Sequence, residues 1–428
     1  MKKLLAFALM AALVLTMVAG CASTAPATEA PKADAPAAAE APKADEPADE
    51  APAADEAPTA NSDFKVGFIF LHDENSTYDK NFLDAALAAC ANVGLADENV
   101  MIKTNIPESN DCYEAAAEMV DAGCNLIFAD SFGHESYVLQ AAQEFPEVQF
   151  AHATGVTAHT AGAANFHNAF ADIYKGRFLA GVAAGMKLNE MIEAGTITAD
   201  QALVGYVGAY PYEEVKSGYT SFFLGVRYMC PTATMEVKFT NSWFDIAKEK
   251  EAAISLINDG CVLISQHADS EGAPKACEEN NVPNVTYNIS TIDIAPNTAL
   301  IATKINWVPY FEKMLKAAMA GENWDIDYCA TMDEGAVEVF GINDKVAAAG
   351  TAEKIEELKA KLSSGELQVF DCSTFTVGGQ AVTSYIANVD ADDAYEPDTE
   401  VVKDGAIHES EFRSAPYFGL DIDGITLK

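Results

Sequence analysis

From residue 64 onward the sequence alternates short apolar runs with segments of helical periodicity, and this alternation constrains the fold more than any other feature. The first apolar run, Val66 to Phe70, has the continuity of a strand buried on both faces, and helical spacing follows at Leu83, Ala86 and Cys90. Repeated units of this kind predict parallel sheets with helices on both faces. Because two such sets follow one another, we expect an α/β fold of two lobes.

The positions at which this pattern restarts predict the domain boundaries. The expected divisions are a first α/β lobe at 64–168, a second α/β lobe at 169–290, a return to the first lobe at 291–322, and a C-terminal segment at 323–428 that completes the lobes. Crossings between the lobes are expected near 165–172, near 288–297 and after about Asn323. Such crossings absorb the change when a cleft closes by hinge motion.

The first sixty residues differ in composition from everything that follows. Residues 1–20 carry two lysines, an apolar run and small residues before Cys21, which is the charge order of a secretory signal peptide. Val18-Ala19-Gly20-Cys21 resembles a bacterial lipobox, so lipidation of Cys21 is expected. The rest of 21–60 is rich in Ala, Pro and acidic residues and has no Leu, Ile, Val or aromatic residue, which predicts a disordered tether.

The net charge and the small number of arginines limit the classes of ligand and partner that this chain can bind. The formal net charge is −39, which argues against binding to nucleic acid or to anionic lipid surfaces. The arginines are Arg177, Arg227 and Arg413, too few for a highly phosphorylated ligand, so a neutral or cationic ligand is favoured. Eight cysteines follow Cys21 without a CxxC pair; small buried side chains are the favoured interpretation, and disulfides stay open.

Polar side chains follow several of the expected strands in both halves of the chain. The polar segments are Asp73 to Asn81, Asp130 to His134, His152 to Gly155, Thr240 to Asp245 and Gln266 to Gly272. Because ligands bind at the carboxyl ends of strands in open α/β sheets, we expect a small-molecule cleft to which both lobes contribute.

Several local motifs together resemble one family. They are Leu126-Ile127-Phe128 with Ser131-Phe132-Gly133, His152-Ala153-Thr154-Gly155, Lys175 to Gly181, Trp243-Phe244-Asp245, Gln266 to Ser270, and Asn306-Trp307 before Pro309-Tyr310. From about Lys65 to Phe375 the chain resembles the basic membrane protein family of lipoproteins, the substrate-binding components of ABC transporters, whose members include purine nucleoside receptors. The resemblance implies a type I periplasmic-binding fold and, as partners, an ABC permease with its ATPase subunits.

The resemblance also implies which residues contact the ligand. Tyr78 and Trp243 match aromatic positions that stack on a purine base from opposite lobes, and stacking contributes roughly 1 to 3 kcal/mol. The other implied ligand-binding residues are Asp73, Asn81, Phe132, His152, Asp269, Asn288 and Lys304. Tyr287-Asn288-Ile289 stands where nucleoside binders have Gly-x-Asp, which leaves a free base and a nucleoside both open.

An enzyme is the less favoured interpretation. The sequence has no G-x-S-x-G elbow, phosphate-binding loop or H-E-x-x-H motif, and no metal or cofactor is expected. We therefore expect a lipid-anchored receptor on the extracytoplasmic face of the cell membrane that captures a purine nucleoside or purine base and makes or breaks no bond. The alternatives are a receptor of the same fold for an autoinducer, a sugar or another heterocycle and, less favoured, a nucleoside-acting hydrolase.

Overall fold

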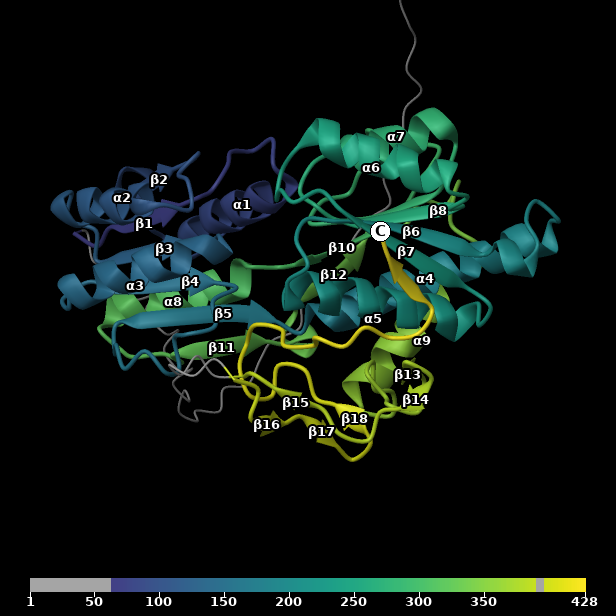
Figure 1. Cartoon of the computed structure of the whole chain (residues 1–428). Helices are drawn as coiled ribbons and strands as arrows, with labels where there is room; N and C mark the ends of the chain where they lie inside the picture. The colour runs from purple at the N-terminus through teal and green to yellow at the C-terminus, as the bar shows by residue number, and fades with distance from the viewer. Residues whose placement is uncertain (1–62, 390–395) are drawn as a thin grey trace, which may run out of the picture. The chain divides into compact units, whose positions relative to one another are not determined.

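Two β-sheets flanked by helices form the framework of this computed structural model (Figure 1). The structure describes residues 63–389 and 396–428. The expected signal peptide at 1–20, the lipidation site Cys21 and the tether at 21–60 lie outside the described residues. None of the helices within the described ranges is both long enough and apolar enough to cross a membrane. The two sheets confirm the predicted two-lobed α/β fold class.

The first sheet has the strand order β11-β5-β4-β3-β1-β2, and all of its neighbouring strands are parallel. Its strands are β1 (Val66–Ile69), β2 (Val100–Lys103), β3 (Leu126–Ala129), β4 (Gln149–Ala153), β5 (Phe166–Ala171) and β11 (Asp327–Ala330). The helices of this lobe are α1 (Thr77–Asn92), α2 (Asn110–Asp121), α3 (Glu135–Glu144) and α8 (Val308–Ala320), with the short turns η1 (Asp97–Asn99) and η2 (Phe132–His134).

The second sheet has the order β12-β10-β9-β8-β6-β7-β19 and is parallel except where β12 pairs with β10. Its strands are β6 (Leu203–Gly208), β7 (Thr234–Phe239), β8 (Leu263–His267), β9 (Asn284–Tyr287), β10 (Ala299–Ile305), β12 (Val337–Phe340) and β19 (Ile425–Leu427). The accompanying helices are α4 (Ile173–Glu193), α5 (Glu213–Met229), α6 (Ile246–Asn258), α7 (Gly272–Asn280) and α9 (Thr351–Ser363), with η3 (Ala199–Gln201) and η4 (Met332–Glu334).

The C-terminal part of the chain contributes to both sheets and then forms small hairpins. It adds β11 to the first sheet and β12 and β19 to the second. The hairpin strands are β13 (Thr376–Val377), β14 (Gln380–Ala381), β15 (Ile386–Ala387), β16 (Thr399–Glu400), β17 (Val402–Lys403) and β18 (Ala406–Ile407). Phe418 packs on Phe370 with ring centroids 4.4 Å apart, and Phe370 in turn stacks on Tyr174 of α4 at 5.4 Å, so this segment docks on the body through aromatic contacts.

Side-chain oxygens cap helices α6, α1 and α2. Asp245 caps α6, because its carboxylate accepts hydrogen bonds from the backbone N–H groups of Ala247 and Lys248. Ser76 caps α1 by accepting from the backbone N–H of Asp79. Ser109 caps α2 by accepting from the backbone N–H of Asp111.

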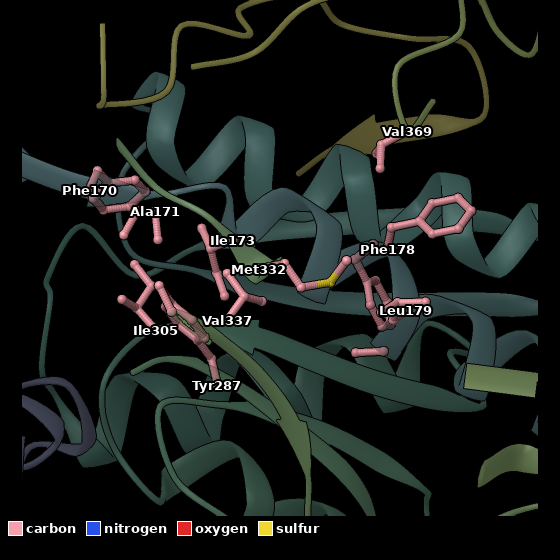
Figure 2. Close-up of a cluster of buried hydrophobic side chains, with 14 of the residues drawn as sticks. Phe170, Ala171, Ile173, Phe178, Leu179, Tyr287, Ile305, Met332, Val337 and Val369 are labelled. Atoms are coloured by element: carbon pink, nitrogen blue, oxygen red, sulfur yellow. The ribbon is translucent and has the colours of Figure 1, made fainter. Parts of the chain in front are cut away.

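The segments that cross between the sheets are hydrogen-bonded to one another. Asp172 lies between β5 and α4, and its carboxylate accepts from the Met332 N–H at 2.7 Å, in the connection between β11 and β12. Asn306, which follows β10, donates its backbone N–H to Ala336 at 2.8 Å. Ile173, Ile305, Met332 and Val337 lie in one buried cluster at these crossings (Figure 2).

Two of the predicted boundaries are corrected by the strand order. The return to the first lobe was expected at 291–322, but β10 stays in the second sheet, and only α8 returns, to pack against α1. The crossing expected near 288–297 therefore lies at Asn306 instead. The apolar run of β10 is buried between β9 and β12, and an apolar run alone does not tell which of two similar sheets it joins.

The cysteines are buried, which is the interpretation that the sequence favoured. The eight cysteines of the described residues are all free thiols, and seven of them are buried, whereas Cys329 is half-buried. Burial raises the pKa of the Cys90 thiol to about 12. Burial is also the largest cause of the raised pKa of the Cys124 thiol, which is about 11. These thiols are consequently protonated and unreactive at neutral pH.

Helices α4 and α5 approach each other backbone to backbone. A Cβ atom on Gly181 would lie 2.0 Å from the carbonyl oxygen of Phe222, and a Cβ atom on Gly225 would lie 2.0 Å from that of Phe178. Both obstructing atoms belong to helix backbones and have no rotamer by which to move away.

We predict that Gly181→Ala lowers the free energy of unfolding by about 2 kcal/mol or more, because the added methyl group forces these helices apart. Helix propensity alone would give the opposite sign, a gain of about 1 kcal/mol. Urea denaturation of the purified protein measures the change, with Ser136→Ala on the exposed face of α3 as the control. A Gly181→Ala protein as stable as the parent would contradict the close packing.

Candidate functional site

A cavity lies between the two lobes. It is lined by Leu71, His72, Tyr78, Asp79, Ser131, Phe132 and Thr154 from the first lobe and by Glu214, Trp243, His267 and Asp269 from the second. Each of these residues ends or follows a parallel strand: β1, β3 and β4 on one side, and β6, β7 and β8 on the other. Of the nine predicted ligand-binding residues, the structure brings Tyr78, Phe132, Trp243 and Asp269 together here.

Tyr78 supplies an aromatic wall from the first turn of α1. Its hydroxyl donates to the backbone oxygen of Asp130 at 2.8 Å, and its ring lies 4.8 Å from that of Phe82. Burial raises the pKa of Tyr78 well above its usual value, so the phenol stays neutral. The ring is therefore fixed at the cavity while its polar end is satisfied by the protein.

Asp130 and Asp79 are neighbouring carboxyl groups beneath the first lobe's side of the cavity, and their pKa values are shifted in opposite directions. Burial, followed by the nearby Asp79, raises the pKa of Asp130 well above its usual value. Burial also opposes the charge of Asp79, but hydrogen bonds from His72 and Ser76 outweigh it and lower the pKa of Asp79. At neutral pH Asp79 carries the negative charge and Asp130 is the protonated partner.

Trp243 and Asp269 form the opposite wall. The Trp243 ring stands edge-on to the Tyr210 ring, with their centroids 5.1 Å apart. The backbone oxygen of Trp243 accepts from the Asp269 N–H at 2.9 Å. The Asp269 backbone oxygen in turn accepts from the Thr77 N–H at 2.8 Å, which joins the two lobes across the cavity. Asp269 is only 4% exposed, and the Asn288 side-chain amide lies 3.5 Å from its carboxylate.

Buried charges surround the Asp269 carboxyl group. Burial raises its pKa well above the usual value, and the nearby carboxylates of Glu249, Asp79 and Glu214 add to the effect, whereas Arg177 opposes it. Arg177 lies behind the cavity, donates to the Gln266 backbone oxygen at 3.0 Å and stacks on the Tyr287 ring. This cation offsets part of the negative charge that the cavity concentrates.

His267 is neutral although it contacts a carboxylate. Its Nε2 lies 3.4 Å from Glu214, which by distance alone would be an ion pair. Burial, and then the charge of Arg177, lower the pKa of His267 to about 4, so the contact at neutral pH is a hydrogen bond from an uncharged ring.

Five predicted ligand-binding residues lie elsewhere. The Asp73 carboxylate accepts from the Asn75 backbone and side chain within its own loop, and the His152 ring is buried against the Ser131 backbone oxygen. Asn81, Asn288 and Lys304 line a different cavity, of about 700 Å³. In each case another group of this protein bonds to the polar atoms on which the prediction rested. The sequence did not reveal these internal partners.

The sequence prediction missed His72, Thr154 and Glu214 as cavity residues. Thr154 stood in a motif carrying the family resemblance, and its position after an expected strand was the available signal. Glu214 lies in the first turn of α5, where an acidic residue is equally expected to favour the helix dipole. His72 follows β1 directly, one residue before the predicted Asp73.

The lining suits a small ring that donates hydrogen bonds. Asp79, Glu214 and Asp269 offer carboxyl oxygens that accept hydrogen bonds, and the aromatic rings of Tyr78 and Trp243 come from opposite lobes. No lysine or arginine is among the described side chains that line this cavity. The described residues also contain no group of His, Cys, Asp and Glu side chains arranged to hold a metal ion.

Comparisons with known proteins found similar sequences over most of the chain. The model of the family described as ABC transporter substrate-binding protein PnrA-like matches residues 68–371. A purine-binding protein of Brucella abortus is 32% identical over 73% of this chain and 84% of its own length. A Haloferax volcanii protein, named as a candidate ABC transporter glucose-binding protein, is 27% identical over 62% of this chain and 64% of its own.

The fold has counterparts among solved structures. A solute-binding protein of an ABC transporter system from Aeropyrum pernix superimposes with a TM-score of 0.60 at 16% identity, over 72% of this chain and 93% of its own. At that identity the likeness concerns the fold alone, which is that of two-lobed solute-binding proteins.

We predict that Asp269→Asn stabilises the ligand-free protein increasingly as pH rises. The pKa of Asp269 is raised on folding, so the folded wild-type protein holds a proton that the unfolded chain releases, and wild-type stability falls as pH rises above about 4. Asparagine does not titrate. The melting temperature of the variant should exceed that of the wild type by about 2 °C or more at pH 8, with a smaller difference at pH 5. An equal difference at both pH values would count against a buried, proton-binding Asp269.

Proposed function

The chain belongs to the family of PnrA-like ABC transporter substrate-binding proteins, and on that premise we propose that it captures a purine base or purine nucleoside between its two lobes and delivers it to a membrane permease. The observation that carries the proposal is the first cavity, where aromatic rings from both lobes accompany buried carboxylates. No catalytic step is part of this function.

A purine matches both features of that cavity. Its flat ring stacks on aromatic side chains, for which Tyr78 and Trp243 are available. Its ring and exocyclic N–H groups donate hydrogen bonds that Asp79 and Asp269 can accept. The relative named as purine-binding supports the same ligand class.

The site residues proposed for purine contact are Tyr78, Phe132, Trp243 and Asp269, joined by His72, Asp79, Thr154 and Glu214. Asn288 acts behind them, because its amide is directed at the Asp269 carboxylate. Asp73 and His152 shape the loops on which cavity residues stand, and His152 does so by bonding to Ser131.

Substrate-binding proteins of ABC transporters act on the extracytoplasmic side of the membrane, and the sequence supports a signal peptide at 1–20 with a lipid anchor on Cys21. The tether of 21–60 would give the folded body reach from the membrane surface to the permease. Metabolic labelling with a radioactive fatty acid tests the anchor, with Cys21→Ala as the unlabelled control.

A sugar is the second candidate ligand, because one relative is named as a glucose-binding protein. Both candidates are tested by calorimetric titration of purified protein that has been stripped of ligand by unfolding and refolding. The panel contains adenosine, guanosine, inosine, adenine, guanine, ribose and glucose. Binding of purines alone supports the proposal, binding of glucose alone supports the second candidate, and silence from a folded protein refutes both.

We predict that Trp243→Ala weakens purine binding by about tenfold to a hundredfold while the melting temperature changes little, because the variant loses one stacking face. Tyr228→Ala, which removes an aromatic ring that is 45% exposed on α5, is the matched control and should bind purine as the wild type does. Unchanged affinity in Trp243→Ala would place this ring in a packing role only.

A further inference from the structure

The C-terminal segment contacts both lobes at a place that is separate from the crossings between the two sheets. The family match ends at residue 371, and well beyond it residues 408–418 lie between the hairpin strand β18 and the edge strand β19 (Figure 1). We call residues 408–418 the strap. The bonds that it makes to each lobe determine what it can do when the lobes move.

The C-terminal end of the strap is fixed to the second lobe. Tyr417 and Phe418 are fully buried, and the Phe418 ring stacks on that of Phe370. Just beyond the strap, Lys216 of α5 donates to the backbone oxygen of Gly419 at 3.1 Å, and β19 then pairs in parallel with β7. Because buried aromatic rings and a strand pair hold it, this end of the strap belongs to the body of the second lobe.

Ser414, within the strap, is held by the first lobe. Its backbone N–H donates to the Asp327 carboxylate at 2.8 Å, and its hydroxyl accepts from the Asn168 side-chain amide at 2.9 Å and also donates to Asp327. Asp327 begins β11 and Asn168 lies on β5, so both partners belong to the first sheet. Ser414 is only 2% exposed, so water competes little for these charge-assisted bonds.

The chain between these two attachments has little length to spare. Ser414 and Tyr417 are three residues apart, which spans at most about 11 Å of fully extended chain. The strap is also bonded to itself, because Arg413 donates to the backbone oxygens of Ala415 at 3.2 Å and Pro416 at 2.8 Å. The Glu409 carboxylate accepts from the Tyr417 N–H at 3.0 Å. The strap therefore cannot extend far without losing its internal bonds.

The attachment at Asp327 lies at a distance from the crossings. Met332, which accepts no change of sheet without its bond to Asp172, is five residues further along the chain, or about 16 Å of extended backbone. A rotation of one lobe about the crossings therefore moves Asp327 relative to Ser414 unless the axis lies along β11. Hydrogen bonds weaken steeply once their length and angle change, so such a rotation breaks this attachment early.

Asn168 connects this attachment to a loop of the first cavity. Its side-chain oxygen accepts from the Gly155 N–H at 2.8 Å, and its side-chain amide donates to the Gly155 backbone oxygen at 2.9 Å. Thr154, which precedes Gly155, lines the first cavity and has a φ of +67°, a value that is rare for a β-branched residue. One side chain thus holds both the strap and a strained loop of the cavity in place.

We propose that the strap holds the ligand-free lobes together, and that the lobes separate fully only when Ser414 releases Asp327 and Asn168. Two-lobed proteins open and close by hinge motion at their connecting segments, and in this chain the strap adds an attachment that opening must break. A segment that served only to cover the second lobe would need no buried bonds to the first sheet. The inference concerns movement of the lobes and does not depend on which ligand the cavity binds.

The test measures the distance between the lobes in protein stripped of ligand by unfolding and refolding. Spin labels are attached through Ser136→Cys on α3 of the first lobe and Glu251→Cys on α6 of the second, because both positions are exposed. Pulsed electron paramagnetic resonance then gives the distribution of distances between the labels. The native thiols of the described residues are buried or half-buried, and protein without the two added cysteines gives their labelling background.

The variants release the strap from the first lobe only. Asp327→Ala removes the acceptor of two Ser414 bonds, and Ser414→Ala removes the hydroxyl while leaving the second-lobe attachment intact. Asp325→Ala is the matched control, because its carboxylate pairs with Lys313 inside the first lobe at 2.7 Å. Melting temperatures establish that each variant is folded, and Ser414→Ala provides the test if Asp327→Ala does not fold.

Wild-type protein and Asp325→Ala should give the same narrow distribution of distances. The distribution should broaden and its mean should shift to longer distances by several ångströms in the folded strap variants. Folded strap variants with the wild-type distribution overturn the proposal, and so does an equal shift in Asp325→Ala. No purine enters the measurement, so a failure of the proposed ligand leaves the result unaffected and the two conclusions can fail separately.

Discussion

The bonding of the crossing segments to one another is the constraint on which the two-lobed arrangement depends. Asp172 accepts from Met332, and Asn306 donates to Ala336, so the crossings are hydrogen-bonded to one another. The hydrophobic cluster around Ile173 and Val337 covers these bonds, and a Cβ on Gly176 would lie only 2.6 Å from Val337. In two-lobed proteins such connecting segments absorb hinge motion, and here strand ends of the two sheets face each other across one cavity.

The charge of the cavity follows from this geometry. Strand ends that face each other bring Asp79 of the first lobe close enough to raise the pKa of Asp269 in the second. Bringing these carboxyl groups together without a ligand is unfavourable, because burial and mutual repulsion both oppose ionisation, and Arg177 offsets only part of the effect. Under the proposed function, a ligand that donates hydrogen bonds to these oxygens would lower the free energy of the closed arrangement specifically. The groups proposed to contact the ligand would thereby couple its binding to closure.

The parts of this structure that could be predicted from the sequence are those set by local periodicity and strand direction. Tyr78, Trp243 and Asp269 follow apolar strands, and parallel strands bring such residues to one edge, so their convergence was predictable. The sheet to which β10 belongs was not predictable, because the apolar run of β10 would suit either sheet. The sequence also could not show that Asp73 and Asn81 form hydrogen bonds within the protein. The partner of Asp73 depends on the conformation of its loop, and the partner of Asn81 lies on a strand more than two hundred residues away.

The segment beyond the family match contributes to the surroundings of the first cavity. The family match ends at residue 371, and Arg413, Ala415 and Pro416 line a cavity that adjoins the first along Phe132, Thr154 and Glu214. All residues that line the first cavity lie within the matched region, whereas the adjoining cavity is lined in part by the segment outside it. This segment is anchored to Asp327 in the first lobe and, through β19, to the edge of the second sheet. Under the proposed function, a change in this loop would therefore alter the surroundings of the bound ligand without changing the lining of the first cavity.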